Sequence, residues 1–436
     1  MEIPYFYKEI ETAPRAQIEK IQLQRLQEII DCALQTPFYK RRLTKVGINC
    51  GKDLTTLEDL KKIPFTTKDD LRQNFPTGML ATSMSNVVRI HSSSGTTGVP
   101  TVIYFTADDL EKWTNLITRS IVATGATKDD IFQNMMTYGL FTGGLGLHYG
   151  AEKLGMTVIP IGGGNTARQL QFMQDFKTTV LHVTPSYLLH IHSKLEELGF
   201  SVDKLSLKKA FIGSEPHSER ARKKIEELYH IDAYNSYGLS EMNGPGMAFE
   251  CVYKDNMHIW EDAYIPEVID PATGEVLPDG QEGEFIATNL IRKAMPLLRY
   301  RTRDLTHLIA EPCRCGRTHR RLSRIVGRTD DMLIINGVNV FPSQIEEVIM
   351  KIPEVGTNYL IQVEKAGALD KLIVKVEIYS KMFLGEAKQL DMLKGKIRDR
   401  LRASITINAN IELHEPGTLP ASEGKAKRVV DIRTEM

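Results

Sequence analysis

A glycine- and hydroxyl-rich segment is the first candidate for chemistry in this sequence. Its residues are Ser92, Ser93, Ser94, Gly95, Thr96, Thr97, Gly98, Val99 and Pro100. Glycine lets a backbone approach a phosphate closely, and clustered hydroxyl and N–H groups can bind its oxygens. The pattern GxxxxGK[ST] is absent, so the segment is not a Walker A loop. Taken alone, the segment suits a phosphate-binding loop and a flexible, hydroxyl-rich hairpin about equally.

Charged and aromatic motifs follow this segment in a fixed order. They are Tyr237-Gly238-Leu239-Ser240-Glu241, Tyr300-Arg301-Thr302-Arg303-Asp304, Gly327-Arg328-Thr329-Asp330-Asp331 and Gly424-Lys425. Carboxylates bind Mg²⁺, an aromatic plane can stack on a base, and a lysine can stabilise charge on a phosphoryl group. Structural alternatives exist for each type. Tyr237 could fill the core, Asp304 could pair with its neighbouring arginines, and Lys425 could belong to a solvated basic tail.

A group of cysteines and histidines suggests a metal site. Cys313 and Cys315 form a loop-like pair after a proline, and Cys251 and His258 lie upstream. Zn²⁺ favours four thiolate and imidazole ligands, and structural zinc sites often combine two short motifs. His319 competes with His258 for the fourth position, and buried thiols without a metal are the alternative to both.

Hydrophobic periodicity predicts the elements that position these residues. Apolar residues at helical spacing predict an amphipathic helix over residues 18–34. Further along, strands are predicted at 157–161, 179–183 and 209–212, and helices at 166–176, 185–198 and 217–229. This repeated order of strand, loop and helix implies crossover connections and a largely parallel sheet. Such sheets bind ligands in the loops beyond the carboxyl ends of their strands.

The pattern changes after residue 327, where a second and smaller unit is expected. Strands are predicted at 332–335, 359–363 and 372–379, and helices at 342–352 and 386–403. The predicted fold class is α/β, with a large N-terminal domain of mixed or parallel sheets and helices and a small α+β C-terminal domain. We place the boundary near Asp330, which gives domains of residues 1–329 and 330–436.

Composition excludes several classes of protein. Of 436 residues, 42% are hydrophobic and 25% are charged, which is typical of a globular protein. Lys plus Arg equals Asp plus Glu at 55 each, so no basic surplus indicates a nucleic acid or a membrane as partner. The sequence contains neither an apolar stretch that would span a bilayer nor an N-terminal signal peptide, so a cytoplasmic location is expected. Five cysteines do not make a disulfide framework. The oligomeric state is left open, with a homodimer among the alternatives.

Taken in order, the motifs resemble the adenylate-forming superfamily of acyl-CoA synthetases, non-ribosomal adenylation domains and luciferases. Segments 92–100, 213–216, 336–342 and 419–425 are similar to phenylacetate–CoA ligases, and the resemblance covers nearly the whole chain. It implies an AMP-forming ligase that joins phenylacetate to coenzyme A through an acyl-adenylate, using ATP and Mg²⁺. The alternatives are another aryl acid such as indoleacetate, another acceptor (a carrier-protein thiol or a deazaflavin), and a zinc-stabilised nucleotide sensor without catalysis.

The resemblance also implies a role for each nucleotide-binding residue. Ser92 to Gly98 would surround the phosphates; Ser214, Glu215, Pro216, Asn235, Ser236, Tyr237 and Gly238 would lie around the adenine; Asp304 would bind the ribose and Arg328 phosphate or ribose. Thr101 follows Pro100 where the family often has a lysine.

For catalysis, the resemblance implies that Glu241 binds Mg²⁺ and that Lys425 stabilises the first transition state. Asp330 would be the hinge about which a mobile C-terminal domain rotates between the two half-reactions. Tyr138, Phe141, Gly143, Gly144 and Gly213 would form the acyl pocket, although Tyr138 and Phe141 could instead fill the core. Ligases of this branch share the Cys-x-Cys-Gly segment, which favours a structural zinc held by Cys251, His258, Cys313 and Cys315.

Overall fold

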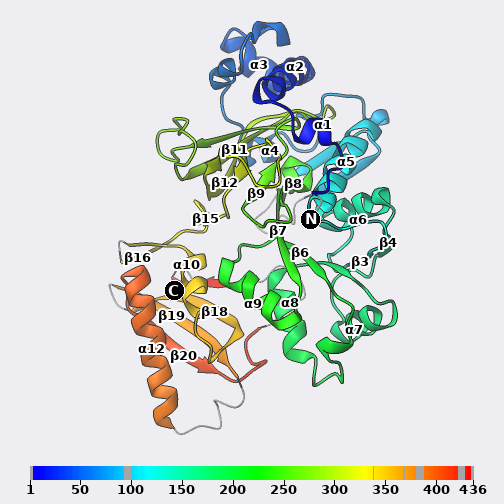
Figure 1. The fold of residues 1–436 in the computed structure, drawn as a ribbon. Coiled ribbons are helices and arrows are strands. Elements are labelled where there is room, and N and C mark those ends of the chain that lie inside the picture. The colour runs from blue at the N-terminus through cyan, green and yellow to red at the C-terminus, as the bar shows by residue number, and fades with distance from the viewer. Residues whose placement is uncertain are drawn as a thin grey trace. The chain divides into compact units, whose positions relative to one another are not determined.

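The computed structural model describes residues 3–92, 100–336, 338–366, 369–379, 387–420 and 428–433 (Figure 1). The chain divides into two compact units, each built from several segments. Unit 1 contains Met1–Gly162, Thr179–His182 and Tyr234–Arg324. Unit 2 contains Gly163–Thr178, Val183–Ala233 and Ile325–Met436.

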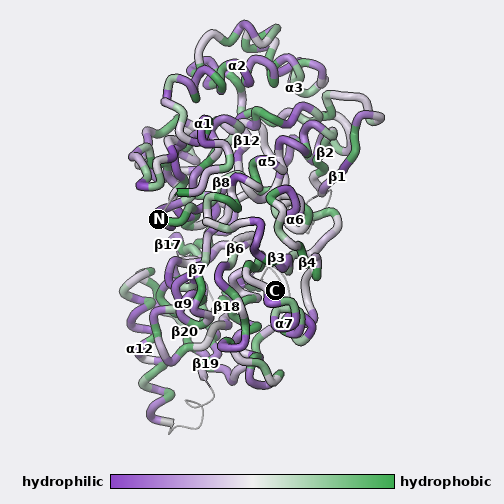
Figure 2. The backbone as a smooth tube through the Cα atoms, turned by 45° about the vertical axis from the view of Figure 1, so that its right-hand side comes forward, coloured by the Kyte–Doolittle hydropathy of each residue, from purple (hydrophilic) through white to green (hydrophobic). Residues whose placement is uncertain are grey.

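The helices of unit 1 are amphipathic or buried. They are α1 (Lys8–Glu11), α2 (Arg15–Ala33), α3 (Pro37–Lys45), α4 (Lys68–Gln73), α5 (Ala107–Ala123) and α6 (Thr142–Leu154). Along α2 the colour in Figure 2 changes repeatedly between hydrophilic and hydrophobic, because only one side of the helix is buried. That side includes Ile18, Leu26 and Ile29, which confirms the amphipathic helix predicted from the sequence.

The strands of unit 1 form parallel and antiparallel groups. They are β1 (Arg89–Ser92), β2 (Val102–Phe105), β3 (Ile131–Asn134), β4 (Thr157–Ile159), β5 (Val180–Val183), β7 (Asp232–Leu239), β8 (Gly244–Glu250), β9 (Met257–Ile259), β10 (Tyr264–Ile269), β11 (Gly283–Asn289), β12 (Leu297–Thr306), β13 (Leu308–Ile309) and β14 (Arg321–Leu322). β3 pairs in parallel with β4 and β5. β7, β8, β9, β14 and β13 are successive antiparallel neighbours, as are β10, β11 and β12. β1 and β2 form a hairpin.

Unit 2 combines three helices and a strand from the middle of the chain with the C-terminal elements. The first group is α7 (Thr166–Asp175), β6 (Lys209–Gly213), α8 (Pro185–Lys194) and α9 (Glu219–Tyr229). The second is β15 (Gly327–Arg328), β16 (Leu333–Ile335), β17 (Val338–Val340), α10 (Pro342–Ile349), β18 (Val355–Ala366), β19 (Leu369–Ile378), α12 (Ala387–Ile405), β20 (Ala409–His414) and β21 (Val429–Asp431).

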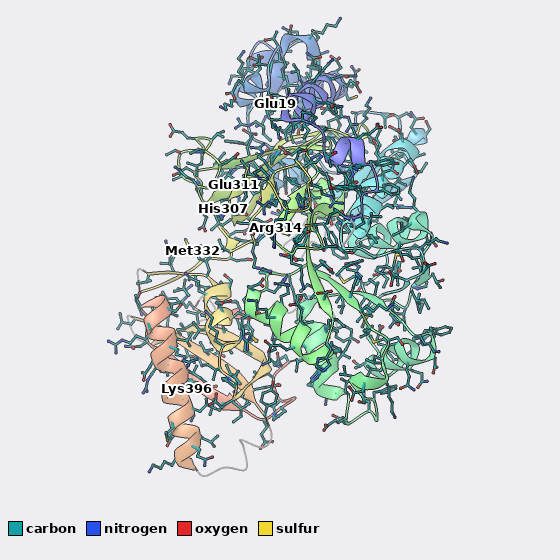
Figure 3. All side chains as sticks on the ribbon, in the orientation of Figure 1. Glu19, His307, Glu311, Arg314, Met332 and Lys396 are labelled. Carbon is teal, nitrogen blue, oxygen red and sulfur yellow. The ribbon has the colours of Figure 1, made fainter. Side chains whose placement is uncertain are left out.

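The C-terminal strands form one mixed sheet in the order β20-β19-β18-β21. β18 and β19 are antiparallel, while β20 and β21 run parallel to their neighbours. α12, the orange helix of Figure 1, packs on this sheet through Leu393, Ile397 and Leu401. Lys396 on the same helix, labelled in Figure 3, pairs with Glu354 at 2.7 Å.

The predicted fold class is confirmed, since the chain has a mixed α/β organisation with helices and strands near the expected positions. Periodicity did not predict the antiparallel groups from β7 to β14, because these short strands are buried and lack a clear alternation of polar and apolar residues. Among the helices within the described ranges, none is long and apolar enough to cross a membrane.

Candidate active site and candidate metal centre

The glycine-rich segment connects the two strands of the β1–β2 hairpin. β1 ends at Ser92 and β2 begins at Val102, and these residues are partners in the register. The N–H of Ser92 donates a hydrogen bond to the carbonyl of Leu140 at 2.9 Å. The predicted phosphate-binding residues Ser93, Ser94, Gly95, Thr96, Thr97 and Gly98 lie outside the described residues, as does Lys425. The hairpin therefore fixes the start and the end of the predicted loop.

Glu241 is a buried carboxylate in the turn that follows β7. Its side chain is about 7% exposed, and its Oε1 accepts a hydrogen bond from the hydroxyl of Thr101 at 3.3 Å. The ammonium of Lys68 lies 3.7 Å from the same oxygen. Arg292 donates to the main-chain carbonyl of Glu241 at 2.8 Å and so holds the turn. A buried carboxylate of this kind suits a hard cation such as Mg²⁺.

Thr101 and Lys68 are neighbours of Glu241 that sequence reasoning did not identify. Thr101 carries one signal, since it follows the glycine-rich segment directly. Lys68 carries none, because it precedes Glu241 by more than 170 positions and stands in an ordinary capping sequence at the start of α4.

Tyr237 and Asp304 come together although they lie on different strands. The Tyr237 hydroxyl donates to Oδ2 of Asp304 at 2.6 Å, from β7 to β12. The Tyr237 ring also meets the edge of Phe285 at 5.9 Å between centroids. Arg301 and Arg303 both pair with Glu284. Asp304 is thus bonded to the predicted adenine-stacking residue, while both of its flanking arginines are engaged by Glu284.

Gly238 is required by the packing of β7 on β8. A Cβ atom on Gly238 would lie 1.9 Å from the carbonyl oxygen of Gly244, a distance that real Cβ atoms do not adopt. Beside it, the N–H of Asn235 donates to Glu250 at 2.8 Å, and Ser236 is the register partner of Phe249. The main chain of this predicted adenine-binding segment is therefore held from one side by β8.

The remaining predicted nucleotide residues belong to unit 2. Gly213 ends β6, and Ser214 follows with a left-handed backbone at φ 68°. The Glu215 carboxylate accepts a hydrogen bond from the N–H of Ser186, at the start of α8, at 2.7 Å. Further along, Arg328 donates two hydrogen bonds to the carboxylate of Asp330, the predicted hinge, at 2.9 and 3.0 Å.

The predicted acyl-pocket residues lie around the start of α6. The Tyr138 hydroxyl accepts from Nδ2 of Asn134 at 2.9 Å and lies 3.1 Å from Nδ1 of His148. Burial raises the pKa of Tyr138 to about 12, so the hydroxyl is neutral. A Cβ atom on Gly143 would lie 2.2 Å from the Phe141 ring. One on Gly144 would lie 2.7 Å from the carbonyl oxygen of Thr137. The absence of side chains at Gly143 and Gly144 therefore allows the ring of Phe141 and the backbone of residues 137–138 to pack closely against the start of α6.

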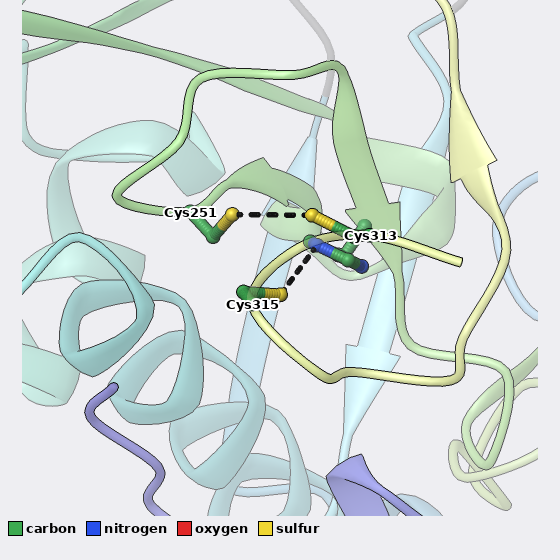
Figure 4. A group of neighbouring side chains, drawn as sticks. Cys251, Cys313 and Cys315 are labelled. Atoms are coloured by element: carbon green, nitrogen blue, oxygen red, sulfur yellow. Dashed lines mark hydrogen bonds between the residues drawn. The ribbon is translucent and has the colours of Figure 1, made fainter. Parts of the chain in front are cut away.

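Four of the predicted metal ligands come together in a buried cluster. The ligand atoms of Cys251, His258, Cys313 and Cys315 all lie within 4.8 Å of one another. Cys251 Sγ and Cys313 Sγ are 3.8 Å apart, and Cys315 Sγ is 3.3 Å from Nε2 of His258 (Figure 4). All five cysteines are free thiols. We call these four residues the Cys–His cluster.

His258, and not His319, is the histidine of the cluster. His258 lies on β9, where its register partners are Phe249 on β8 and Arg321 on β14. Both ring nitrogens of His319 are used elsewhere, since Nδ1 accepts from the N–H of Glu261 at 2.9 Å and Nε2 lies 3.0 Å from the carbonyl of Ile10. The sequence could not distinguish the two histidines, because strand pairing decides which one faces the cysteines.

The donor set fits a tetrahedral zinc ion. Zinc–sulfur bonds of about 2.3 Å at tetrahedral angles place two sulfurs about 3.8 Å apart, which is the separation found for Cys251 and Cys313. Hydrogen bonds from Cys251 lower the pKa of Cys315 and of Cys313, while the same contacts raise the pKa of Cys251, so the three thiols share their protons within the cluster. Four neighbouring ligands would leave no open coordination position, as in a structural site.

The loop that carries Cys313 and Cys315 also holds the N-terminal segment. The Tyr5 hydroxyl donates to the carbonyl of Cys315, and the guanidinium of Arg317 pairs with Glu11 at 2.7 Å. Both members of this ion pair have side chains with no exposed surface. Arg314, labelled in Figure 3, lies between the two cysteines in sequence, with its guanidinium 4.6 Å from the centre of the Tyr253 ring. A metal in this cluster would therefore stabilise two segments about 300 residues apart.

Two family models match the chain. The model for AMP-binding enzymes matches residues 42–289, and the model for the AMP-binding enzyme C-terminal domain matches residues 337–433.

Similar proteins match over nearly the full length. The phenylacetate-coenzyme A ligase of Thermus thermophilus is 45% identical, over 98% of this chain and 99% of its own length. The phenylacetate-coenzyme A ligase of Aromatoleum evansii is 46% identical, over 97% of this chain and 96% of its own. Among solved structures, 2-hydroxyisobutyryl-CoA ligase in the postadenylation state, in complex with R3-HIB-AMP, has a TM-score of 0.92 at 28% identity, with 98% and 92% of the two chains covered.

Proposed function

The chain belongs to the AMP-binding enzyme family, and from this premise we propose that it is an AMP-forming acid–thiol ligase that joins phenylacetate to coenzyme A. The observation that carries the proposal is the identity of about 45% to phenylacetate-coenzyme A ligases from two organisms across nearly all of the chain. The reaction uses ATP and coenzyme A, so we place it in the cytoplasm.

The reaction we propose has two half-reactions. A carboxylate oxygen of the acid attacks the α-phosphorus of ATP, the bond to the bridging oxygen breaks, and pyrophosphate leaves. The thiolate of coenzyme A then attacks the carbonyl carbon of the acyl-adenylate, and AMP leaves with the electron pair of the acyl–oxygen bond. Lys425 would stabilise the charge that spreads over the phosphoryl oxygens in the first step.

Residues of unit 1 would bind and orient the nucleotide. Glu241 would hold Mg²⁺, which neutralises phosphate charge, while Thr101 and Lys68 keep the carboxylate in place. Asp304 would accept hydrogen bonds from the ribose hydroxyls. The 2.6 Å bond from Tyr237 supports this role, because it fixes both the carboxylate and the tyrosine ring that would face the adenine.

The chain would divide functionally near Asp330 into a nucleotide- and acid-binding domain of residues 1–329 and a mobile C-terminal domain of residues 330–436. The bidentate contact of Arg328 with Asp330 supports a hinge there, because it ties the first residue of the C-terminal domain to the last strand before it. We also propose one structural Zn²⁺ in the Cys–His cluster, supported by the donor set and its spacing.

The test is a panel of acids scored by AMP release that depends on coenzyme A. Phenylacetate and its ring-substituted relatives should react, with benzoate and medium-chain fatty acids much poorer, because a ring on a one-carbon tether brings its carboxylate to the α-phosphate. Omitting coenzyme A should leave acid-dependent exchange between ATP and pyrophosphate. Faster turnover of octanoate or acetate would overturn the aryl substrate, and absence of any acid-dependent exchange would overturn the ligase itself.

A further inference from the structure

Within unit 2, one face of α9 is attached to the elements that begin the C-terminal domain. The N–H of Ser218, the N-cap residue of α9, donates to Oε2 of Glu346 on α10 at 2.7 Å. Arg220 Nε donates to the carbonyl of Met350 at 3.4 Å, and Lys224 Nζ to the carbonyl of Val355 at 3.2 Å. Ala221, between them, belongs to the hydrophobic core of the C-terminal sheet and its helices. We call these contacts of Ser218, Arg220, Ala221 and Lys224 the α9 seat.

Glu346 is the one carboxylate among these contacts, and it is buried. Its hydrogen-bond partners are the N–H of Ser218 and the hydroxyl of Tyr359 on β18. The charged groups that face it are Arg428, next to β21, and Glu215, in the loop after β6. Arg428 is itself bound to the carbonyl of Tyr359 at 3.0 Å and lies over that ring, with its guanidinium 4.5 Å from the centroid.

The α9 seat begins where the predicted adenine-binding loop ends. Glu215 belongs to that loop and precedes Ser218 by three residues, and its carboxylate is bound to the N–H of Ser186 at 2.7 Å. Ser218 therefore joins the end of this loop to the carboxylate of Glu346. Through the hydrogen bond from Ser218, the α9 seat places Glu346 close to the loop that is predicted to bind the adenine.

We propose that Glu346 is a positioning residue that holds the C-terminal domain on α9 during acyl-adenylate formation, and that protonation of its carboxyl strengthens this attachment. The proposal rests on the proposed ligase function, since it assigns the seat to one of the two half-reactions. It extends that function by making the balance between the half-reactions depend on pH.

The direction of the pH effect follows from the buried position of the carboxyl. Burial raises the pKa of Glu346 to about 7 when the seat is formed, and the repulsion of Glu215 acts in the same direction, while the hydrogen bond from Ser218 and the charge of Arg428 lower it. A carboxyl released to water has an ordinary pKa of about 4.3. The seated form therefore binds the extra proton, and the seat is weakened as the pH rises through about 7.

Lys224 is the other titratable group of the seat. Burial lowers its pKa to about 8, so its own loss of charge begins in the range in which Glu346 ionises; because Lys224 is retained in a variant altered only at Glu346, its effect cancels when wild type is compared with that variant at the same pH. Between pH 6 and pH 8, linkage predicts a decrease of about tenfold in the seating equilibrium from Glu346.

The experiment compares the two half-reactions of the full-length enzyme from pH 6 to pH 8. The first is measured as phenylacetate-dependent ATP–pyrophosphate exchange and the second as thioester formation from supplied phenylacetyl-adenylate. In E346Q the amide oxygen still accepts from Ser218 but carries no titratable proton. We expect the wild-type rate of the first half-reaction, divided by that of E346Q at the same pH, to fall up to about tenfold. For thioester formation, the wild-type rate divided by the E346Q rate should stay constant or rise with pH. The coenzyme A thiol titrates equally in both assays, so its effect cancels from this quotient.

Two further variants keep the proposal open to refutation. E346A removes the acceptor and should slow exchange severalfold at every pH while sparing thioester formation, with E346Q restoring the rate at pH 6. E347A is the matched control, because Glu347 is the next residue on α10 and its carboxylate pairs with Lys351 at 2.9 Å. Parallel pH profiles for wild type and E346Q would contradict the role proposed for Glu346. So would an equal decrease in the rates of both half-reactions in E346A. A wild-type enzyme without acid-dependent exchange would instead overturn the ligase function.

Discussion

The Cys–His cluster and the carboxylates Glu241 and Asp304 are two buried polar regions of unit 1 with opposite designs. In the cluster, four donor atoms face one another within 4.8 Å and leave room for one ion. Glu241 instead lies beside a threonine hydroxyl and a lysine ammonium, and Asp304 accepts a hydrogen bond from a tyrosine hydroxyl. The cluster is closed around its centre, whereas the two carboxylates are predicted to bind ligands that enter and leave.

This difference predicts that one region contributes mainly to folding stability and the other mainly to the reaction. A closed set of ligands lowers the free energy of the folded chain for as long as its ion is bound. A buried carboxylate that binds a substrate destabilises the folded chain while the substrate is absent, because its charge is partly desolvated. Binding of the substrate offsets this destabilisation. Substitutions in the cluster should therefore lower stability with little effect on the chemical step, and substitutions around the carboxylates should do the reverse.

The largest effect on chemistry is expected for Lys425→Ala. Loss of a group that stabilises transition-state charge typically costs about 10²–10³-fold in rate, so ATP–pyrophosphate exchange should fall by that factor. Thioester formation from supplied acyl-adenylate and the melting temperature should change little. Lys427→Ala, two positions later, is the matched control, and equal loss in both half-reactions would show that Lys425 has another role.

The largest effect on stability is expected for Cys313→Ser. It should remove the bound zinc, measured as one ion per chain by elemental analysis, and lower the free energy of unfolding by roughly 3 kcal/mol. The residual folded enzyme should keep a near-normal rate of exchange. Cys32→Ser, at a half-buried cysteine outside the cluster, should change neither quantity.

The histidine of the cluster can be tested in the same way. His258→Ala should lose the zinc and His319→Ala should retain it, because both ring nitrogens of His319 are engaged by Glu261 and Ile10. Wild-type protein that contains no metal and melts normally would contradict the site, and the reverse outcome for the two histidines would reassign its fourth ligand.

An intermediate effect is expected for Asp304→Asn. The amide oxygen can still accept from Tyr237, but the charged acceptor for the ribose is lost, and such bonds contribute about 1.5–3 kcal/mol. The KM for ATP should rise roughly 10- to 100-fold, with unchanged zinc content. Tyr237→Phe, which removes only the 2.6 Å bond, should raise it by less than about tenfold. A fall in melting temperature without a change in KM would place Asp304 among the structural residues.

The smallest effect at neutral pH concerns His182 and the acid sensitivity of unit 1. Burial lowers the pKa of His182 to about 3, so the unfolded chain takes up a proton first as the pH falls below about 6.5. Stability should fall between those values by up to about 1.4 kcal/mol per pH unit. His182→Asn keeps a donor for Asn134 and should have a shallower acid limb in thermal unfolding. If loss of zinc alone causes the decrease in stability at low pH, the melting temperatures of wild type and His182→Asn will decrease in parallel as the pH falls.

The sequence by itself determined the elements and the order of the motifs. The apolar spacing that predicts the helix over 18–34 depends only on residues three and four positions apart, and α2 follows it closely. The same is true of Cys313 and Cys315, whose two-residue separation brings them into one loop whatever the rest of the chain does. The family resemblance, confirmed by the match to AMP-binding enzymes, rests on such short segments taken in order.

Tertiary structure alone decided which distant residues meet. The pairing of β8, β9 and β14 placed His258 among the cysteines, and the start of α4 placed Lys68 beside Glu241. Glu346 lies within the helix predicted over 342–352, and packing of α9 on α10 buries its carboxyl. The contacts of Cys315 with His258, of Ser218 with Glu346 and of Lys68 with Glu241 join residues 57, 128 and 173 positions apart, and periodicity over a few residues has no information about them. They depend on how sheets and helices close around a shared core, which is a property of the folded chain as a whole.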